Sequence, residues 1–114
     1  MKRVLILGGG FGGLATATAL REKLSSEDEV IIVDRRTHFM MGLRKSWVLT
    51  GQATLEAGQR SLSLLEQRGI KWINGSIASI DPAARSAVVD DQRIEADTLV
   101  VALGAQFTVD KIPG

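Results

Sequence analysis

The sequence predicts an α/β fold, in which a parallel sheet lies in a three-layer arrangement with helices and a small antiparallel meander. Two apolar segments, Val4 to Leu7 and Val30 to Val33, flank a glycine turn and an Ala- and Leu-rich segment, and the first predicted strand begins at Arg3. Both are continuously apolar rather than alternating, which is typical of parallel strands covered on both faces. Short strand-like segments separated by turn residues follow in the second half of the chain and predict the meander.

The segment between the first two predicted strands has the glycine spacing G-x-G-x-x-G. Gly8 permits a tight turn out of the strand, Gly10 leaves room for a ligand beside the backbone, and Gly13 allows close packing of the helix. A helix predicted over residues 11–24 would present free N–H groups and the positive end of its dipole at this turn. Ala17 adds a second small contact between helix and strand.

The second predicted strand ends on an acidic residue, Asp34, about 20 residues after the glycine turn. A carboxylate at this position can accept hydrogen bonds from ribose hydroxyls. Strand, glycine turn, helix, strand and acid together predict a Rossmann-like unit that binds a dinucleotide. The alternatives are a glycine turn without a ligand, a solvated Asp34, and an Arg35–Arg36 clamp for a 2′-phosphate, which Asp34 would repel.

Later elements follow from periodicity and turn residues. A helix is predicted over residues 59–68, with Gly69 as its C-cap, and a third strand over residues 70–73. The remaining predicted strands are 76–80, 86–89 and 93–96 in the meander, and 98–103 after it. Residues 35–58 have no clean period, and such a long apolar loop is usually functional or covered by another surface.

Composition excludes several classes of protein. The 114 residues suffice for one domain, and a net charge of +1 does not favour a nucleic-acid partner. The absence of cysteine excludes a disulfide, a thiolate nucleophile and a Cys-based metal site, and the single His38 cannot form a metal cluster alone. Five glycines within residues 8–13 argue against a signal peptide, and no uninterrupted apolar run would span a membrane. We therefore expect a cytoplasmic protein, or one at the cytoplasmic membrane surface.

The order of these elements resembles the N-terminal FAD-binding segment of the pyridine nucleotide-disulfide oxidoreductase superfamily. Residues 96–105, ADTLVVALGA, resemble its strand YDxLVxATGA, with Leu103 in place of the usual Thr. Two stretches resemble the sulfide:quinone oxidoreductase and type II NADH dehydrogenase branch. These are FMMGLRKSWVLTG, residues 39–51, and GIKWINGSIASIDP, residues 69–82. The first lacks the prolines common in that branch.

This resemblance implies FAD as the cofactor, with NAD(P)H as a candidate co-substrate of the full-length protein. The implied cofactor-binding residues are Gly8, Gly10, Phe11, Gly12 and Gly13 at the diphosphate, Asp34 and Arg35 at the adenosine ribose, Ile77 at the adenine through its backbone, and Ala102 and Gly104 near the flavin or diphosphate. No residue qualifies as a catalytic acid, base or nucleophile.

Members of the family are several times longer, so the resemblance implies that residues 1–114 are one incomplete FAD-binding domain, the N-terminal fragment of a longer flavoprotein. The intact protein would pass electrons from NAD(P)H or sulfide to a quinone or another acceptor. We expect the isolated chain to be inactive and to bind FAD weakly or not at all, because a partial site offers less contact to offset the ordering of a long ligand.

Two other functions remain open. The chain is alternatively an NAD(H)-binding Rossmann domain of a dehydrogenase, although such domains usually continue with βα units rather than a meander. It is alternatively a non-catalytic remnant that forms a homodimer through an exposed surface. For the apolar residues Met40, Met41 and Trp47 the alternatives are a surface that faces a quinone or a membrane, a contact with another part of a longer protein, and a local core.

Overall fold

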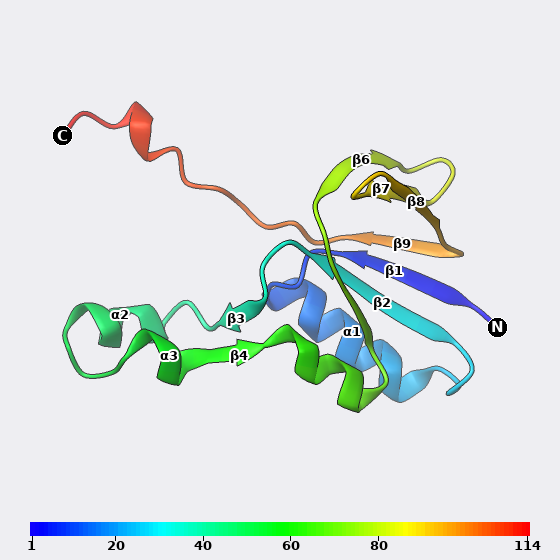
Figure 1. The fold of residues 1–114 in the computed structure, drawn as a ribbon, viewed down its shortest axis with the longest axis horizontal. Coiled ribbons are helices and arrows are strands. Elements are labelled where there is room, and N and C mark those ends of the chain that lie inside the picture. Colours follow the sequence, from blue (N-terminus) through cyan, green and yellow to red (C-terminus); the bar gives the residue numbers. More distant parts are fainter.

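The computed structural model describes residues 1–114 and shows a parallel sheet between a helix and a meander (Figure 1). The helix on one face is α1, Phe11–Lys23. The sheet has the order β5-β2-β1-β9, and the strands are β1 (Arg3–Leu7), β2 (Glu29–Asp34), β5 (Lys71–Asn74) and β9 (Thr98–Val101). The antiparallel meander on the other face contains β6 (Ile77–Asp81), β7 (Ser86–Val89) and β8 (Gln92–Glu95). The predicted α/β class is confirmed.

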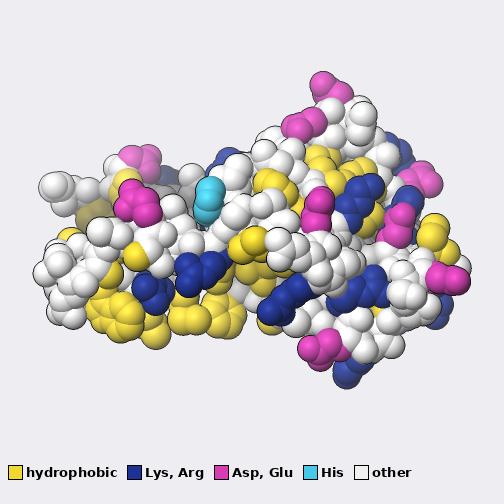
Figure 2. Space-filling model, turned by 60° about the horizontal axis from the view of Figure 1, so that its bottom comes forward, with side chains coloured by type: hydrophobic (Ala, Val, Ile, Leu, Met, Phe, Trp, Pro, Cys, Tyr) yellow, Lys and Arg dark blue, Asp and Glu magenta, His cyan; other side chains and the backbone are white.

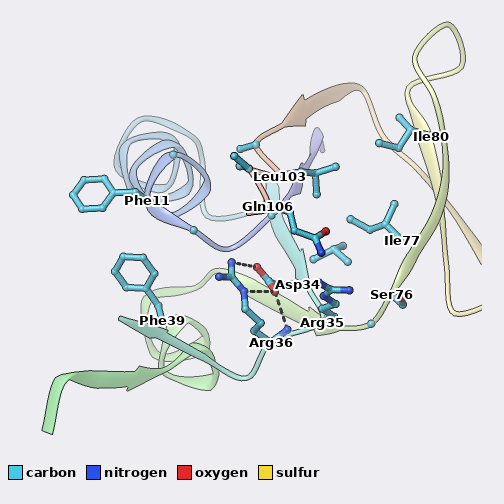
Figure 3. A pocket seen from close by; sticks show the side chains of 18 of the residues that line it. Phe11, Asp34, Arg35, Arg36, Phe39, Ser76, Ile77, Ile80, Leu103 and Gln106 are labelled. Carbon is cyan, nitrogen blue, oxygen red and sulfur yellow. Dashed lines mark hydrogen bonds and ion pairs between the residues drawn. The ribbon is translucent and has the colours of Figure 1, made fainter. Parts of the chain in front are cut away.

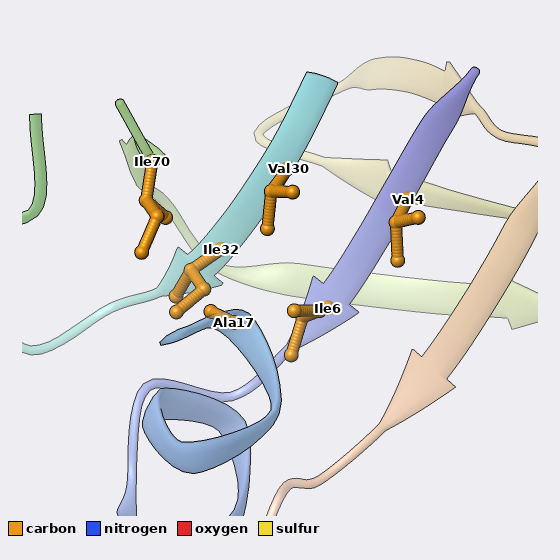
Figure 4. Packing of buried hydrophobic residues seen from close by; sticks show 6 residues of the cluster. All are labelled: Val4, Ile6, Ala17, Val30, Ile32 and Ile70. Atoms are coloured by element: carbon orange, nitrogen blue, oxygen red, sulfur yellow. The ribbon is translucent and has the colours of Figure 1, made fainter. Parts of the chain in front are cut away.

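The two central strands divide their side chains between two cores, because successive residues of a strand point to opposite faces. Toward α1 the core contains Val4, Ile6, Val30 and Ile32 with Ala17 and Ile70 (Figure 4). Toward the meander it contains Leu5, Leu7, Ile31 and Val33 with Ala87 and Val89. This division explains why β1 and β2 are apolar at every position.

Part of the chain that connects β2 to β5 projects away from the sheet (Figure 1). This projecting segment contains β3 (His38–Met40), α2 (Arg44–Leu49), α3 (Leu55–Gly58) and β4 (Gln59–Ser61). The 3₁₀ helix η1 (Leu62–Arg68) follows β4 and packs against the core, and a second 3₁₀ turn, η2 (Val109–Lys111), lies near the C-terminus. The prediction of one helix over residues 59–68 was therefore wrong. The first three of these residues pair with β3, and the Ser61 hydroxyl accepts from the Ser63 N–H at the start of η1.

Gly69 ends η1 as predicted, in a left-handed conformation with φ +74°. Its N–H donates to the Glu66 carbonyl at 3.0 Å. A Cβ here would lie 3.5 Å from the Arg21 Cδ, so space is available and only the backbone conformation opposes a side chain. Gly69→Ala should therefore lower the free energy of unfolding in urea by about 1 kcal/mol.

Gly42 provides the control for this prediction. It has no positive φ, and a Cβ added to it would meet nothing within 4 Å. Gly42→Ala should change the free energy of unfolding by no more than about 0.5 kcal/mol. Equal effects of the two substitutions would show that the Gly69 conformation does not limit stability.

Candidate functional site

An open cleft of about 1330 Å³ lies at the carboxyl ends of the parallel strands. Gly8 follows β1, Asp34 ends β2, and Ala102 follows β9, so the three strand ends meet at this cleft. Chain connections diverge here, and ligands of open α/β sheets bind at such a point. The cleft exceeds the roughly 300–1,000 Å³ of sites for drug-sized ligands, which favours an extended ligand.

Two glycines of the turn are required by backbone packing. Gly8 has φ +107°, and a Cβ on it would lie 2.1 Å from the Ala102 carbonyl oxygen. A Cβ on Gly13 would lie 1.8 Å from the Gly8 carbonyl oxygen. The tight turn at Gly8 and the close packing at Gly13 agree with the structural roles predicted for them.

The next two glycines border open space instead. The atom nearest to a Cβ on Gly10 is the Arg36 Nη2, and the atom nearest to one on Gly12 is the Ala102 Cβ, each at 3.8 Å. The backbone N–H groups of Phe11 and Gly12, in the first turn of α1, donate to no atom of the chain. Together with the helix dipole, these unpaired donors favour an anion at this end of the cleft.

Asp34 is only 6% exposed and is the only buried carboxylate of the chain. Its Oδ2 accepts from the Gly9 N–H at 2.7 Å and from the Arg36 Nη2 at 3.0 Å, while its Oδ1 accepts from the Arg36 N–H at 2.8 Å and Nε at 3.2 Å. Burial alone would raise the pKa of the Asp34 carboxyl. The hydrogen bonds from Arg36 and Gly9 outweigh burial and hold this pKa below its ordinary value.

A side-chain amide fixes the backbone that follows β2. The Asn74 Nδ2 donates to the carbonyl oxygen of Asp34 at 3.1 Å and to that of Arg35 at 2.9 Å. The Gly75 N–H also donates to the Asp34 carbonyl, at 3.2 Å. The end of β5 therefore holds the turn that carries Asp34 and Arg35.

The glycine turn and Asp34 form one wall of the cleft, and the start of the meander forms a second wall. Residues 75–80 line the cleft, and a register shift between Ile77 and Ser79 interrupts the pairing of β6 with β7. The Asp90 carboxylate, in the turn between β7 and β8, accepts from the Ser76 N–H at 3.0 Å. Figure 3 shows Ile77 and Ser76 on one side of the Asp34–Arg36 pair, with Phe11 and Phe39 on the other. The phenyl rings of Phe11 and Phe39 pack edge to face, with their centroids 6.1 Å apart.

The segment after β9 forms the third wall. Gly104 has φ +71°, and nothing lies within 4 Å of a Cβ added there. The left-handed backbone conformation, rather than a close neighbour, therefore explains why this residue is glycine. Gln106 and Phe107 continue this wall.

Most of the predicted site residues line this one cleft: Gly8, Gly10, Phe11, Gly12, Asp34, Arg35, Ile77, Ala102 and Gly104. Gly13 lies beneath it, against Gly8. The sequence did not assign Phe39, Ser76, Gln106 or Lys45 to the site, and it suggested Arg36 only as part of a 2′-phosphate clamp or as a solvated or ribose-flanking residue. The charged residues of the lining are Asp34, Arg35, Arg36 and Lys45, which gives the cleft a net charge of +2 at neutral pH.

Comparison with known proteins gives matches along nearly the whole chain. The profile of the pyridine nucleotide-disulphide oxidoreductase family matches residues 2–114. The mitochondrial sulfide:quinone oxidoreductase of Mus musculus is 31% identical over an alignment of 114 positions, which covers 97% of this chain and 25% of that protein. The type II NADH:quinone oxidoreductase of Staphylococcus haemolyticus is 31% identical over an alignment of 119 positions, which covers 99% of this chain and 29% of that protein.

Among solved structures, the sulfide:quinone oxidoreductase of Aquifex aeolicus superposes with a TM-score of 0.86 and 31% identity. The match covers 93% of this chain and 25% of that one. The chain thus spans about a quarter of the length of these relatives. A family profile that matches all but the first residue, together with this superposition, shows that the chain belongs to the pyridine nucleotide-disulphide oxidoreductase family.

Proposed function

We propose that this chain forms the adenosine and diphosphate part of an FAD site in a flavin-dependent oxidoreductase. The unpaired N–H groups at the start of α1 carry the proposal, because they face a large cleft of net positive charge. A diphosphate is the anion that suits a helix N-terminus next to a turn without side chains. Asp34, at the end of β2, is in the position of a ribose ligand.

The geometry of the glycine turn fits this cofactor. Gly10 and Gly12 leave open space above the backbone, as close approach of a diphosphate requires. The wall formed by Ser76 and Ile77 faces Asp34 and would take the adenine, while Ala102 and Gly104 would lie toward the flavin. The flavin, when bound, supplies the electron-transfer chemistry, and the protein supplies binding and orientation. We assign no catalytic acid or base to these residues.

We extend the proposal from the relatives to the electron donor and acceptor. The matched relatives are named for sulfide or NADH and for quinone, so we propose NAD(P)H or sulfide as the donor and a quinone as the acceptor. Because the chain spans about a quarter of their length, we propose that it acts as one domain of a longer flavoprotein.

The end of the projecting segment carries an exposed apolar surface that is suited to contact with another surface. Figure 2 shows hydrophobic side chains gathered there beside Lys and Arg. Within residues 41–55 the exposed large apolar residues are Met41, Leu43, Trp47, Leu49 and Leu55. None of the helices has the length and hydropathy needed to cross a bilayer. We therefore propose that this surface meets another domain, a second copy of the chain, or a membrane surface.

The test of the proposed cofactor is a side-by-side titration of the ¹⁵N-labelled chain with FAD and NADH, followed by NMR. We expect FAD to bind weakly but more tightly than NADH, with the largest shifts at residues 8–13 and 34–36. Binding of NADH in preference to FAD would favour a dehydrogenase domain. Binding of neither ligand, together with a stable dimer in light scattering, would favour the non-catalytic remnant over the proposed function.

Gly10→Ala tests the position of the diphosphate. Its methyl group would lie 3.8 Å from the nearest atom, so the fold has room for it, but it would occupy the space of the ligand. We expect the affinity for FAD to fall by about tenfold or more, as for loss of a charge-assisted contact. Thermal unfolding of the variant should match wild type. Unchanged affinity would place the diphosphate elsewhere.

A further inference from the structure

The carboxylate of Asp34 has no acceptor position left for a ribose. A carboxylate offers about four lone-pair sites. Two donors reach Oδ2, from the Gly9 N–H and the Arg36 Nη2, and two reach Oδ1, from the Arg36 N–H and Nε. A ribose hydroxyl can bond to Asp34 only when one of these donors leaves.

The four donors differ in their freedom to leave. The N–H groups of Gly9 and Arg36 belong to the backbone, which is fixed by the glycine turn and by the end of β2. The Nε and Nη2 donors belong to the Arg36 side chain, which is 60% exposed. Solvent screens an ion pair that has one exposed partner, so the Arg36 guanidinium is the donor group most readily exchanged. Its departure would free one position on each carboxylate oxygen, which matches the two hydroxyls of a ribose diol.

The guanidinium already lies beside the proposed diphosphate position. The Arg36 Nη2 is the atom nearest to a Cβ built on Gly10, at 3.8 Å. A guanidinium has five N–H donors, and Asp34 receives two of them, so three remain for another acceptor. Figure 3 shows the Arg36 side chain between Asp34 and the Phe11–Phe39 pair.

We propose that Arg36 is a cofactor-binding residue that exchanges partners: its guanidinium leaves Asp34 for the diphosphate, and the ribose diol takes the two vacated positions on the carboxylate. This inference rests on the proposed function of the cleft. Arg–phosphate hydrogen bonds are charge-assisted, so the bond gained is at least as strong as the exposed pair lost. Arg35, in contrast, makes no ion pair in the structure.

The test compares adenosine with ADP as probes, because only ADP carries a diphosphate. In Arg36→Met the side chain keeps its approximate length and loses all its donors. Adenosine should bind the variant more tightly than wild type, because the Asp34 positions are free. ADP should lose at least about tenfold relative to adenosine, the usual effect of a charge-assisted hydrogen bond. Dissociation constants from NMR titration give both values.

Arg35→Met is the matched control, because Arg35 precedes Arg36 and also lines the cleft. It should leave the ratio of the two affinities within about twofold, because a contact of Arg35 with the ribose would change the binding of both probes alike and its exposed charge contributes little at the diphosphate. Parallel weakening of adenosine and ADP in Arg36→Met would show that Arg36 only supports Asp34 and would overturn the exchange. An unchanged ratio would overturn it as well. Failure of wild type to bind either probe would instead refute the proposed function, and the exchange with it.

Discussion

Gly13→Ala is expected to destabilise the chain by about 3–5 kcal/mol, the range of the most damaging single substitutions. The added Cβ would lie 1.8 Å from the Gly8 carbonyl oxygen and 3.5 Å from the Ile6 Cγ2. The first clash is with backbone, so no side-chain rotation relieves it, and α1 must shift away from β1. Ala17 and Ile6 would then lose their contact in the core. Urea unfolding followed by circular dichroism measures the effect.

Gly12→Ala is the control, because it alters the neighbouring residue of the same helix. Its Cβ would approach only the Ala102 Cβ, at 3.8 Å. Alanine is the better helix former, so the variant should be as stable as wild type or more stable by up to about 1 kcal/mol. If Gly13→Ala unfolds at the same urea concentration as Gly12→Ala, the close approach of α1 to the turn does not determine stability.

The unit from β1 to β2 was predictable because its signals are local. Continuous apolar runs, small residues at Gly13 and Ala17, and an acid at the strand end each follow from neighbouring residues. The meander was predictable for the same reason. Asp90 and Asp91 both have positive φ in the two-residue turn between β7 and β8, as their position between two short strands suggested.

The projecting segment was not predictable, because its structure depends on contacts between distant residues. Residues 59–61 extend because they pair with residues 38–40, and nothing in their own sequence distinguishes this strand from a helical turn. Leu62 and Leu65 have helical spacing, but they continue as a 3₁₀ helix. Leu62 is 2% exposed, and Leu65 packs against the core beneath α1.

The site was predictable at its glycines and Asp34 but not at Arg36. The family resemblance implied Arg35, next to Asp34, as the residue beside the ribose. However, an Asp side chain commonly accepts a hydrogen bond from the backbone N–H two residues later, and the Arg36 N–H donates in this way to the Asp34 Oδ1. The chain bends at Arg35, the Arg36 guanidinium also reaches the carboxylate, and this two-residue spacing was the signal available in the sequence.

Asp34→Asn is expected to lower the free energy of unfolding at pH 7 by about 2 kcal/mol, the scale of hydrogen bonds to a buried charged group. Each carboxylate oxygen accepts two donors, so an amide nitrogen in either position would face two N–H groups without an acceptor. Asp91→Asn is the matched control. Asp91 is exposed, accepts no hydrogen bond and has a φ of +66°, which asparagine tolerates. It should have almost no effect in urea unfolding.

The pH dependence of this loss distinguishes the charge of Asp34 from its shape. The hydrogen bonds of Arg36 and Gly9 keep the pKa of Asp34 in the folded chain below its unfolded value, which is about 3.9. The stabilisation by the carboxylate is therefore complete above the unfolded pKa and is lost as the pH falls through the folded pKa. Since asparagine does not titrate, the stability difference between wild type and Asp34→Asn should narrow as the pH falls below about 4. A difference that stays constant from neutral to acidic pH would mean that the packing of Asp34, rather than its charge, holds the glycine turn against β2.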